Sequence, residues 1–328
     1  MTAVARFVII AFLRRNPLAP INAGNGGLMK LLSMKIGDAN HAGIVVGDEV
    51  LDVTALAATG STSGTEWLES PSRLEDALDL YRLGVEKLSA LVEAHKEAGP
   101  LLPLDSIKLN PPVLRPGKIL AVGLNYAAHA AEQNIKPPES PLIFSKNVTA
   151  LIAAGEPIQL PHASERVDYE AELAFVIGRE ARSVSAEDAF DYVAGYTIVN
   201  DVTARDLQAR EKQWVRAKGL DSFAPCGPWL VTRNEIADPH ALDISLRVND
   251  ELRQQSNTSD LIFKIPQLVE FISQDLTLRP GDIISTGTPS GVGVFMDPPV
   301  YLQGGEQIEI TIASLGQLRN PVAGRAAR

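Results

Sequence analysis

The chain is almost free of cysteine, because Cys226 is the single one among 328 residues. One thiol cannot form a disulfide within the chain, so the fold does not depend on an oxidising compartment. A catalytic thiol needs an accessible position and a histidine nearby. The segment Ala-Pro-Cys-Gly-Pro at 224–228 has no histidine close to it in sequence. We therefore expect Cys226 to be a small buried apolar group.

Long hydrophobic runs are also missing. The apolar stretch Phe7–Leu13 has seven residues, far fewer than the roughly 20 that span a bilayer. Arg14 and Arg15 follow it in place of a small-residue cleavage site, so a secretory signal fits poorly. We expect residues 1–28 to be a disordered extension or the product of a start codon placed too early. An organelle-targeting segment is the weaker alternative, and the expected location is cytoplasmic.

The chain also lacks an excess of positively charged residues. The chain has 30 Lys and Arg against 40 Asp and Glu, a formal net charge of −10. An acidic chain repels phosphate backbones, and no polybasic stretch is present, so we expect neither nucleic acid nor a membrane surface as a partner. The 45% of apolar residues predicts a folded globular protein. An anionic small molecule would need a local positive site, made by a metal or by placed Lys and Arg.

Residues 29–97 are predicted to form a small N-terminal α+β domain. Two β-branched runs around Gly47-Asp48 are typical of a hairpin between positions 43 and 53. Apolar residues at helical spacing predict one amphipathic helix over Leu74–His95. Five prolines between positions 100 and 116 break regular structure, so residues 98–116 are predicted to be a linker.

Residues 117–322 are predicted to form the main domain, with a tail at 323–328. Short strand-like runs alternate with Gly, Pro and Asp turns, and few helices stand between them. We expect helices over 185–192, where Ser185 and Asp188 have capping-box spacing, and over 265–276. Helices do not alternate regularly with strands, which favours an α+β, mainly β chain with a mixed β-roll or barrel-like sheet over a doubly wound fold.

The segment 168–178 carries the most informative pattern. Its odd positions from Tyr169 to Ile177 are apolar, whereas Glu170 and Glu172 occupy even positions. On a strand both glutamates point to one side, about 7 Å apart. Two like charges beside apolar surface are costly unless a cation joins them, and hard divalent ions prefer carboxylate oxygens. An isolated Glu-x-Glu is more often a solvated strand face, so this motif alone does not decide.

A third carboxylate strengthens the interpretation. Residues 195–201 predict a strand that ends in Asn200-Asp201, and a short helix follows, with Thr203 and Asp206 at capping spacing. A carboxylate at the end of an apolar strand is a common place for a ligand or catalytic residue.

Taken together, the sequence from about residue 117 to 322 resembles the fumarylacetoacetate hydrolase family, with a weaker match over residues 29–97. Several separate blocks in the right order are more specific than any one motif. The blocks are Gly123–Glu132, Pro141–Lys146, Asp168–Leu173, Gly195–Asp206, Ala217–Pro225 and Pro280–Gly293.

The resemblance implies a β-roll catalytic domain, a homodimer and one divalent metal ion, Mg²⁺ or Mn²⁺ with Ca²⁺ as a further option. Carried over by position, the metal ligands are Glu170, Glu172 and Asp201, the same residues that the strand pattern selected. The remaining coordination positions would go to water and to the carboxylate and keto oxygens of a 2-keto acid.

His129 and Glu132 are three residues apart in a segment predicted as a short helix over 126–134, so they share a face. A carboxylate beside an imidazole orients it and stabilises its charged form. Taken alone, a histidine on an Ala-rich helix is usually a surface residue. The resemblance implies instead that this pair activates a water.

The resemblance also implies a catalytic role for Lys218, whose cation would hold a carboxylate or a developing enolate. Further candidates for substrate contact follow from the same blocks. They are Asn125, Tyr126, Lys146, Arg205, Gln208 and Thr288. The Gly-rich turn around Thr288 lacks the Lys-Ser/Thr of a phosphate-binding loop. One departure is Leu124, where many members carry Arg before the Asn, and this puts the substrate's distal group in doubt.

We predict a metal-dependent hydrolase that cleaves a C–C bond in a small 2,4-diketo (acylpyruvate-type) acid, in aromatic or sugar-acid catabolism. In this hypothesis, the dyad deprotonates a water, hydroxide attacks the 4-carbonyl, and an enolate of pyruvate type leaves. Three alternatives stay open. One is a decarboxylase or keto–enol isomerase of the 5-oxopent-3-ene-1,2,5-tricarboxylate or 2-hydroxyhepta-2,4-dienedioate type. The others are a ureidoglycolate lyase and an inactive metal-binding scaffold.

Overall fold

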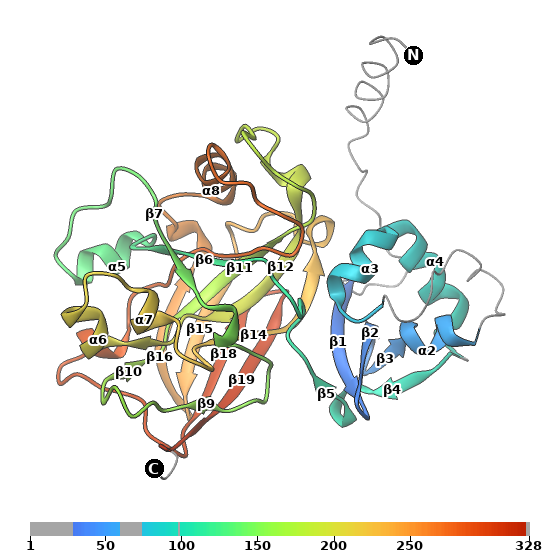
Figure 1. Cartoon of the computed structure of the whole chain (residues 1–328), viewed down its shortest axis with the longest axis horizontal. Coiled ribbons are helices and arrows are strands. Elements are labelled where there is room, and N and C mark those ends of the chain that lie inside the picture. The colour runs from blue at the N-terminus through green and yellow to red at the C-terminus, as the bar shows by residue number, and fades with distance from the viewer. Residues whose placement is uncertain (1–28, 60–73, 98, 326–328) are drawn as a thin grey trace.

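A twelve-stranded sheet runs through both halves of the chain (Figure 1). The structure is a computed structural model that describes residues 29–59, 74–97 and 99–325. In spatial order the sheet contains β4 (Leu101–Pro103), β3 (Glu49–Asp52), β2 (Ala39–Val46), β1 (Lys30–Ile36), β14 (Ala224–Thr232), β12 (Val193–Asn200), β11 (Ala171–Ile177), β17 (Ile283–Ser285), β6 (Ile119–Gly123) and β7 (Leu142–Lys146). Two short strands join it from the side, β5 (Lys108–Leu109) on β1 and β8 (Leu151–Ile152) on β14.

Two further sheets complete the β-structure of the described residues. The larger has five strands, in the order β16 (Glu251–Asn257), β15 (Asp243–Val248), β18 (Gln307–Ile312), β19 (Gly316–Ala323) and β9 (Ile158–Gln159). The smaller pairs β10 (Val167–Asp168) with β13 (Thr203–Ala204). The prediction of an α+β chain with mainly β-structure is confirmed, whereas the roll description and the domain boundaries stay predictions.

The helices are short and lie around the sheets. They are α2 (Val53–Ala58), α3 (Ala77–Leu83), α4 (Val85–His95), α5 (Ala127–Glu132), α6 (Arg205–Arg210), α7 (Val215–Lys218) and α8 (Ile265–Ser273). Single 3₁₀ turns are η2 (Leu104–Ser106), η3 (Val148–Ala150), η4 (Ala189–Tyr192), η5 (Arg233–Glu235), η6 (Thr258–Asp260) and η7 (Gly293–Phe295). No helix of the described segments is long and apolar enough to cross a membrane.

The N-terminal strands extend the sheet of the main domain. β1 pairs with β14 through Lys30 and Leu31, and the predicted hairpin is present as β2 and β3. The predicted helix over Leu74–His95 is wrong as a single element, because Gly84 has a φ of 93° and separates α3 from α4. The predicted linker also contains regular structure, since β4 pairs with β3 and β5 with β1. Residues 1–28 lie outside the described residues.

Three other local predictions need correction. Residues 185–192 form only the turn η4, although Ser185 Oγ does donate to Asp188 Oδ2 at 2.9 Å. The strand predicted over 168–178 is interrupted at 169–170, where the chain passes from β10 to β11. The helix after Asp201 begins only at Arg205 and has no side-chain cap, because the Thr203 hydroxyl donates instead to the Asp201 carbonyl at 2.9 Å.

The centre of the main domain is β11, which is buried on both sides. Leu173, Phe175 and Ile177 lie in the hydrophobic core that the five-stranded sheet shares. Ala174 and Val176 lie in the core that includes α3 and α4. A strand enclosed in this way holds any polar group at its ends away from bulk water.

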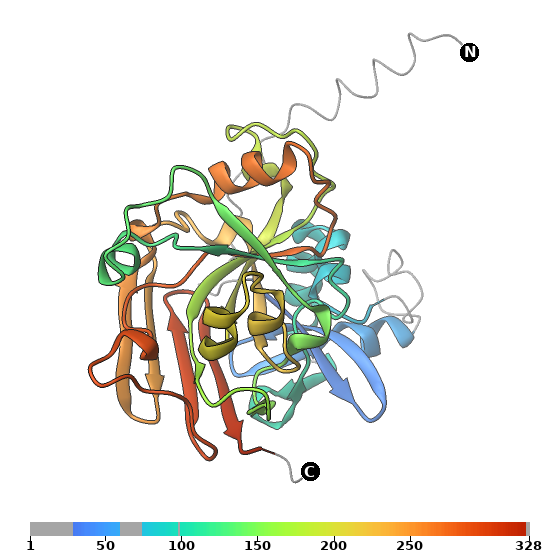
Figure 2. The same cartoon turned by 60° about the vertical axis from the view of Figure 1, so that its left-hand side comes forward.

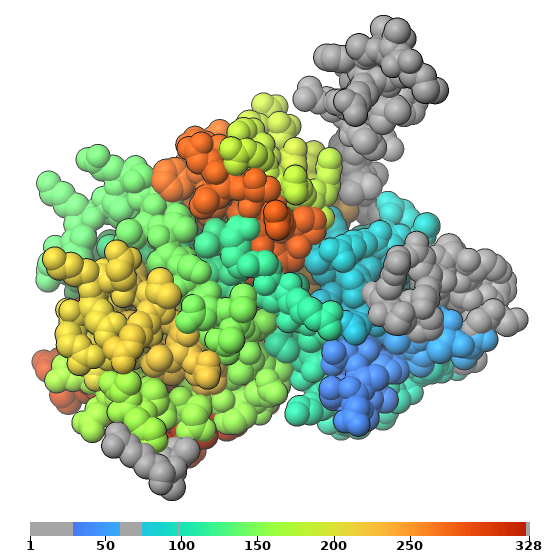
Figure 3. All heavy atoms as spheres, in the orientation of Figure 1, coloured from blue at the N-terminus to red at the C-terminus, as the bar shows by residue number. Residues whose placement is uncertain are grey.

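Short segments close over one side of this centre. Figure 2 shows α6 and α7 lying across the front of the main domain, and α7 packs near β7 and β13. In the space-filling view, the same residues form a yellow area at the surface beside green residues of the α5–β7 region (Figure 3). The functional residues predicted from the sequence lie at the ends of β11 and β12, in these covering segments and, for Thr288, in the turn after β17.

Candidate active site

Three carboxylates meet at one end of the strand pair β11–β12. Glu170 directly precedes β11, Glu172 is its second residue, and Asp201 directly follows β12. The antiparallel register pairs Ala171 with Asn200, so the start of one strand meets the end of the other. One oxygen of each carboxylate lies within 4.8 Å of the other two. The structure therefore brings together the three residues that were predicted as metal ligands.

The burial of this cluster excludes a solvated acidic strand face. The exposed fractions are 4% for Glu170, 1% for Glu172 and 0% for Asp201. Ionised carboxylates out of contact with water are strongly unfavourable unless cations or hydrogen-bond donors surround them. The surroundings of each carboxylate therefore decide what the cluster can do.

Two lysines supply part of the compensating charge. Lys218 Nζ lies 2.8 Å from Glu170 Oε2 and 2.6 Å from Asp201 Oδ2, and it donates to Thr203 Oγ1 at 2.9 Å. Lys146 Nζ lies 2.5 Å from Asp201 Oδ1. Lys218 lines the central cavity, but Lys146 is fully buried and does not line it. The structure thus places Lys146 as a counter-ion of Asp201, whereas the sequence analysis expected a substrate contact.

Glu172 is the carboxylate without a cationic partner among the described residues. Its Oε2 accepts hydrogen bonds from Ser285 Oγ at 2.5 Å and from Gly287 N at 3.0 Å. Burial, with the charges of Asp201 and Glu170 nearby, raises the pKa of Glu172 well above its usual range. A cation bound at this strand end would stabilise the ionised form of Glu172.

Arg205 links Glu170 to a fourth carboxylate. Its Nη2 lies 2.7 Å from Glu170 Oε1, and its Nε donates to Asp168 Oδ2 at 2.8 Å. Its Nη1 donates to Gln208 Oε1 at 3.1 Å. Burial alone would raise the pKa of Glu170, but the charges of Lys218 and Arg205 outweigh burial and lower it to about 2. Glu170 is therefore ionised over the whole neutral range.

Asp168 fixes a loop over the cavity and was not among the predicted site residues. It accepts hydrogen bonds from the backbone N–H groups of Gly293 at 2.8 Å and Val294 at 3.0 Å. Val294 and Phe295 line the central cavity. The sequence placed Asp168 beside the glutamates but gave no signal for this contact, which joins segments 125 residues apart.

The donor set fits a hard divalent cation. Three buried carboxylates offer only oxygen ligands, and Glu172 has no ion-pair partner among the residues that the structure describes. Mg²⁺, Mn²⁺ and Ca²⁺ all accept oxygen ligands of this kind. Glu170, Glu172 and Asp201 would hold the ion.

The predicted His129–Glu132 pair is present on α5. His129 Nδ1 lies 2.6 Å from Glu132 Oε1, and Glu132 Oε2 accepts from Gly291 N at 3.1 Å. The other ring nitrogen, Nε2, lies 2.9 Å from Gln133 Nε2. His129 and Gln133 both line the central cavity, and the Phe295 ring lies 6.2 Å from the imidazole ring. Gln133 was missed in the sequence, although its place next to Glu132 was available as a signal.

Thr288 reaches the cavity from the turn after β17. Its hydroxyl donates to Ala171 O at 3.0 Å and accepts from Gln254 Nε2 at 2.8 Å. Gln254 Oε1 accepts from Ala171 N at 2.9 Å. Gln254, which was not predicted, thus fixes the backbone between the two glutamates and the position of Thr288.

Asn125 and Tyr126 do not line the cavity. Asn125 is fully buried and donates to Thr286 O at 2.7 Å and to Phe263 O at 3.0 Å. Tyr126 is also buried, and burial raises the pKa of its hydroxyl above its usual range. Both residues support the start of α5, whereas the sequence analysis expected substrate contacts.

The central cavity has a volume of about 370 Å³, suited to a small metabolite. Five charged residues line it together with His129, Gln208 and Thr288. They are Glu170, Glu172, Asp201, Arg205 and Lys218. Phe144 and Trp214 form an aromatic part of the wall, with ring centroids 5.4 Å apart, and Lys218 Nζ lies 5.0 Å from the Phe144 centroid.

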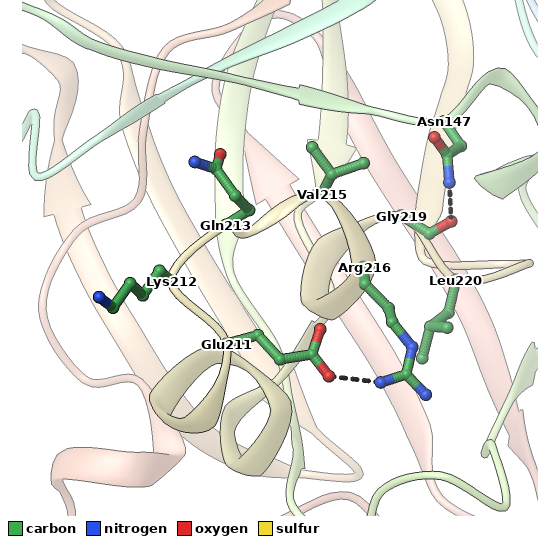
Figure 4. Close-up of a pocket in the computed structure, with 8 residues that line it drawn as sticks. All are labelled: Asn147, Glu211, Lys212, Gln213, Val215, Arg216, Gly219 and Leu220. Carbon is green, nitrogen blue, oxygen red and sulfur yellow. Dashed lines mark hydrogen bonds and ion pairs between the residues drawn. The ribbon is translucent and has the colours of Figure 1, made fainter.

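A second cavity of about 470 Å³ lies on the outer side of α6 and α7 (Figure 4). Asn147 donates to Gly219 O at 2.7 Å there, and Glu211 pairs with Arg216. None of the carboxylates or lysines of the cluster lines it. Its larger volume therefore does not make it the reaction site. Cys226 is buried, as expected, and burial raises the pKa of its thiol to about 12.

Comparisons with known proteins agree on one family. The model for the C-terminal domain of fumarylacetoacetate (FAA) hydrolase matches residues 118–323. An oxaloacetate tautomerase of Rattus norvegicus, described as mitochondrial, is 48% identical over 253 residues, which are 77% of this chain and 81% of that protein.

The chain is also similar to solved structures of fumarylacetoacetate hydrolase and of maleylpyruvate hydrolase. A fumarylacetoacetate hydrolase from Exiguobacterium antarcticum superposes with a TM-score of 0.76 at 34% identity, covering 90% of this chain and all of that one. A maleylpyruvate hydrolase from Sphingobium sp. SYK-6, in complex with manganese(II) and pyruvate, superposes with a TM-score of 0.73 at 34% identity, covering 91% of this chain and all of that one.

Proposed function

The chain belongs to the fumarylacetoacetate hydrolase family of enzymes, and from this premise we propose that it is a divalent-metal-dependent keto–enol tautomerase for a small 2-keto dicarboxylic acid of the oxaloacetate type. One observation carries the proposal: a histidine–carboxylate base and a buried cation beside three carboxylates line the same cavity. A base and a stabilised negative charge are what enolisation requires. The oxaloacetate tautomerase name of a relative with 48% identity supports the choice of reaction.

The substrate's acidic groups meet positive charge and hydrogen-bond donors in this cavity. Arg205 and Lys218 supply the cations, and Gln208 and Thr288 supply neutral polar groups. When bound at the triad, a divalent ion supplies a Lewis acid that polarises the 2-keto group. Lys218 adds positive charge where the oxygen of C2 becomes negative.

His129 moves the proton. Its imidazole accepts a proton from C3, and the electron pair of that C–H bond becomes the second bond between C2 and C3. Glu132 stabilises the imidazolium through Nδ1 at 2.6 Å. The proton is then delivered to the oxygen of C2, so the enol forms with no net gain or loss of atoms. The reverse sequence returns the ketone.

The test is exchange of the C3 protons of oxaloacetate with D₂O, followed by NMR, beside the decay of the enol absorbance. Metal-stripped protein is measured with and without Mg²⁺ or Mn²⁺. Enzyme-dependent exchange that needs the metal and is lost in His129→Gln supports the proposal. A rate equal to that of buffer, with tight metal binding and a stable fold, contradicts it.

The predicted cleavage of a 2,4-diketo acid is the second candidate. The maleylpyruvate hydrolase with 34% identity and a TM-score of 0.73 favours it. The same base would then act on a water. An acylpyruvate panel distinguishes the two reactions, because cleavage gives pyruvate and tautomerisation does not. Pyruvate from oxaloacetate alone would identify a decarboxylase.

Compartment and assembly are further parts of the proposal. The sequence predicted a cytoplasmic homodimer, whereas the rat relative is named as mitochondrial. Cell fractionation and light scattering of the full chain measure these two properties directly.

A further inference from the structure

Gln133 completes a chain of hydrogen bonds that fixes the proton of His129. Glu132 Oε2 accepts from Gly291 N at 3.1 Å, and Glu132 Oε1 lies 2.6 Å from His129 Nδ1. His129 Nε2 lies 2.9 Å from the amide nitrogen of Gln133. An ionised carboxylate only accepts hydrogen bonds and an amide NH₂ only donates them. With the amide nitrogen turned toward Nε2, this chain of contacts fits a proton on Nδ1 and a free electron pair on Nε2.

The same geometry disfavours the charged imidazole. An imidazolium carries N–H on both nitrogens, so its Nε2–H would face the N–H groups of the Gln133 amide. This donor–donor contact is removed only if the Gln133 amide rotates by about 180°, so that its Oε1 accepts a hydrogen bond from Nε2–H. Gln133 can thus satisfy either protonation state, but each state needs its own amide orientation.

Gln133 also covers Nε2 of His129. Neutral Nε2 has one acceptor position, and the amide of Gln133 fills it at 2.9 Å. The Phe295 ring lies 6.2 Å from the imidazole ring, and 7% of the His129 side chain is exposed. A water at Nε2 would first have to displace the amide.

We propose that Gln133 is a positioning residue that keeps His129 as a neutral base protonated on Nδ1 and that favours proton transfer with the substrate over activation of water. This rests on the proposed role of the dyad as the base. During turnover, the substrate C–H takes the place of the amide at Nε2. The amide, turned round, then accepts from the Nε2–H that has formed, until the proton is returned to the substrate oxygen.

The test compares Gln133→Glu with Gln133→Ala in the full-length, metal-loaded enzyme. The first variant keeps the size of the side chain but replaces the donor with an acceptor. The second removes the group and opens space for water beside Nε2. Gln133 is partly exposed, so neither change disturbs a core, and thermal unfolding checks the fold. The other charged groups near the imidazole, Glu132, Glu170, Arg205 and Lys218, are unchanged in both variants, whereas Gln133→Glu adds one carboxylate at Nε2.

The first readout needs no activity. ¹⁵N NMR of histidine-labelled protein reports the protonation of each ring nitrogen, with His129→Gln to assign the signal among five histidines. Wild type should show the neutral Nδ1–H form at pH 7, and Gln133→Glu should show an imidazolium. An unchanged His129 signal in Gln133→Glu overturns the proposal, whether or not the enzyme turns over oxaloacetate.

The second readout is kinetic. Gln133→Glu should lower kcat for proton exchange at least tenfold with an unchanged KM, because the base is already protonated. Gln133→Ala should raise the ratio of acylpyruvate cleavage to tautomerisation. Equal losses of kcat in the two variants, with an unchanged ratio of the two reactions, would mean a merely structural role and would also overturn the proposal.

Discussion

The two walls of the central cavity are built in different ways. The strand wall carries Glu170, Glu172 and Asp201 at the ends of β11 and β12, and buried lysine and arginine side chains pair with Glu170 and Asp201. The helix wall carries His129 and Glu132 on α5, a helix of six residues. In the proposed function, the strand wall would therefore join fold stability to metal binding. The helix wall would transfer the proton, and we expect it to contribute little to stability.

α5 depends on other segments for its position. Its N-cap residue, Tyr126, makes no side-chain cap bond, and Asp260 instead accepts from Ala128 N at 3.0 Å. Gly291 donates to Glu132 at the other end. These two contacts come from loops outside the strand pair β11–β12. The predictions below test this division between the walls, starting with the largest expected effect.

Asp201→Asn should damage fold and activity together. The substitution leaves Lys146 and Lys218 buried without one of their charged partners. Breaking a buried ion pair of this kind costs about 3–5 kcal/mol of unfolding free energy. Chemical denaturation and metal titration measure both losses. Asp105→Asn, an exposed site, is the matched control, and equal stability of the two variants would refute the role given to the strand wall.

Glu172→Gln should separate metal binding from stability. Glutamine keeps an acceptor for Ser285 and Gly287 but removes the carboxylate that has no ion-pair partner among the described residues. A Lewis acid contributes several kcal/mol, so activity should fall on the order of a thousandfold. The metal-free variant should be at least as stable as metal-free wild type at pH 7. A loss of stability like that of Asp201→Asn would contradict the charge assignment.

The pH dependence of metal-free wild type follows from the same residue. The pKa of Glu172 is raised in the folded state, so its contribution to stability is present below about 4.5 and is lost as pH rises through the folded value. Unfolding free energy measured across pH should lose this component in Glu172→Gln and when metal is bound. A component that persists in the variant would point to another group.

His129→Gln should remove turnover alone. Loss of a general base lowers kcat on the order of 10²–10³-fold. Metal affinity and unfolding free energy should stay close to wild type, because no contact of the strand wall changes. Isothermal titration and steady-state kinetics measure the difference. His162→Gln, at an exposed position, is the control and should have wild-type turnover.

Asp260→Ala should have the smallest effect. Loss of a helix cap costs about 1 kcal/mol, which corresponds to roughly a fivefold change in the population of ordered α5. We expect a fall in kcat of that size, with faster hydrogen exchange in α5 and unchanged metal affinity. Asp275→Ala, another exposed aspartate, should change neither quantity. A weaker metal site in Asp260→Ala would mean that the walls are coupled.

In both walls, the sequence indicated the residues whose spacing is local and not the contacts between distant segments. Period-two alternation placed Glu170 and Glu172 on one side of a strand, and a short-range spacing placed His129 beside Glu132. Both patterns depend on the spacing of nearby residues along a strand or helix, which can be read from the sequence alone. The sequence did not show the partners of Lys146 and Asn125, because these partners lie 55 and 161 residues away and only the fold brings them together.

Gln254 and Asp168 illustrate the same limit. Gln254 comes from the five-stranded sheet and contacts Ala171 across 83 residues, and Asp168 contacts Gly293 across 125. The broken helix at Gly84 has a local cause, since glycine permits a φ of 93° and the apolar period continues past it. Periodicity shows which face is buried, but it does not show where the backbone turns.

The most direct test of the central claim is C3 proton exchange of oxaloacetate in D₂O with metal-loaded enzyme, with pyruvate measured in the same sample. The account predicts metal-dependent exchange above the buffer rate without pyruvate, and loss of exchange in His129→Gln while the metal still binds. Pyruvate formed at the rate of exchange, or exchange that persists in His129→Gln, would contradict it.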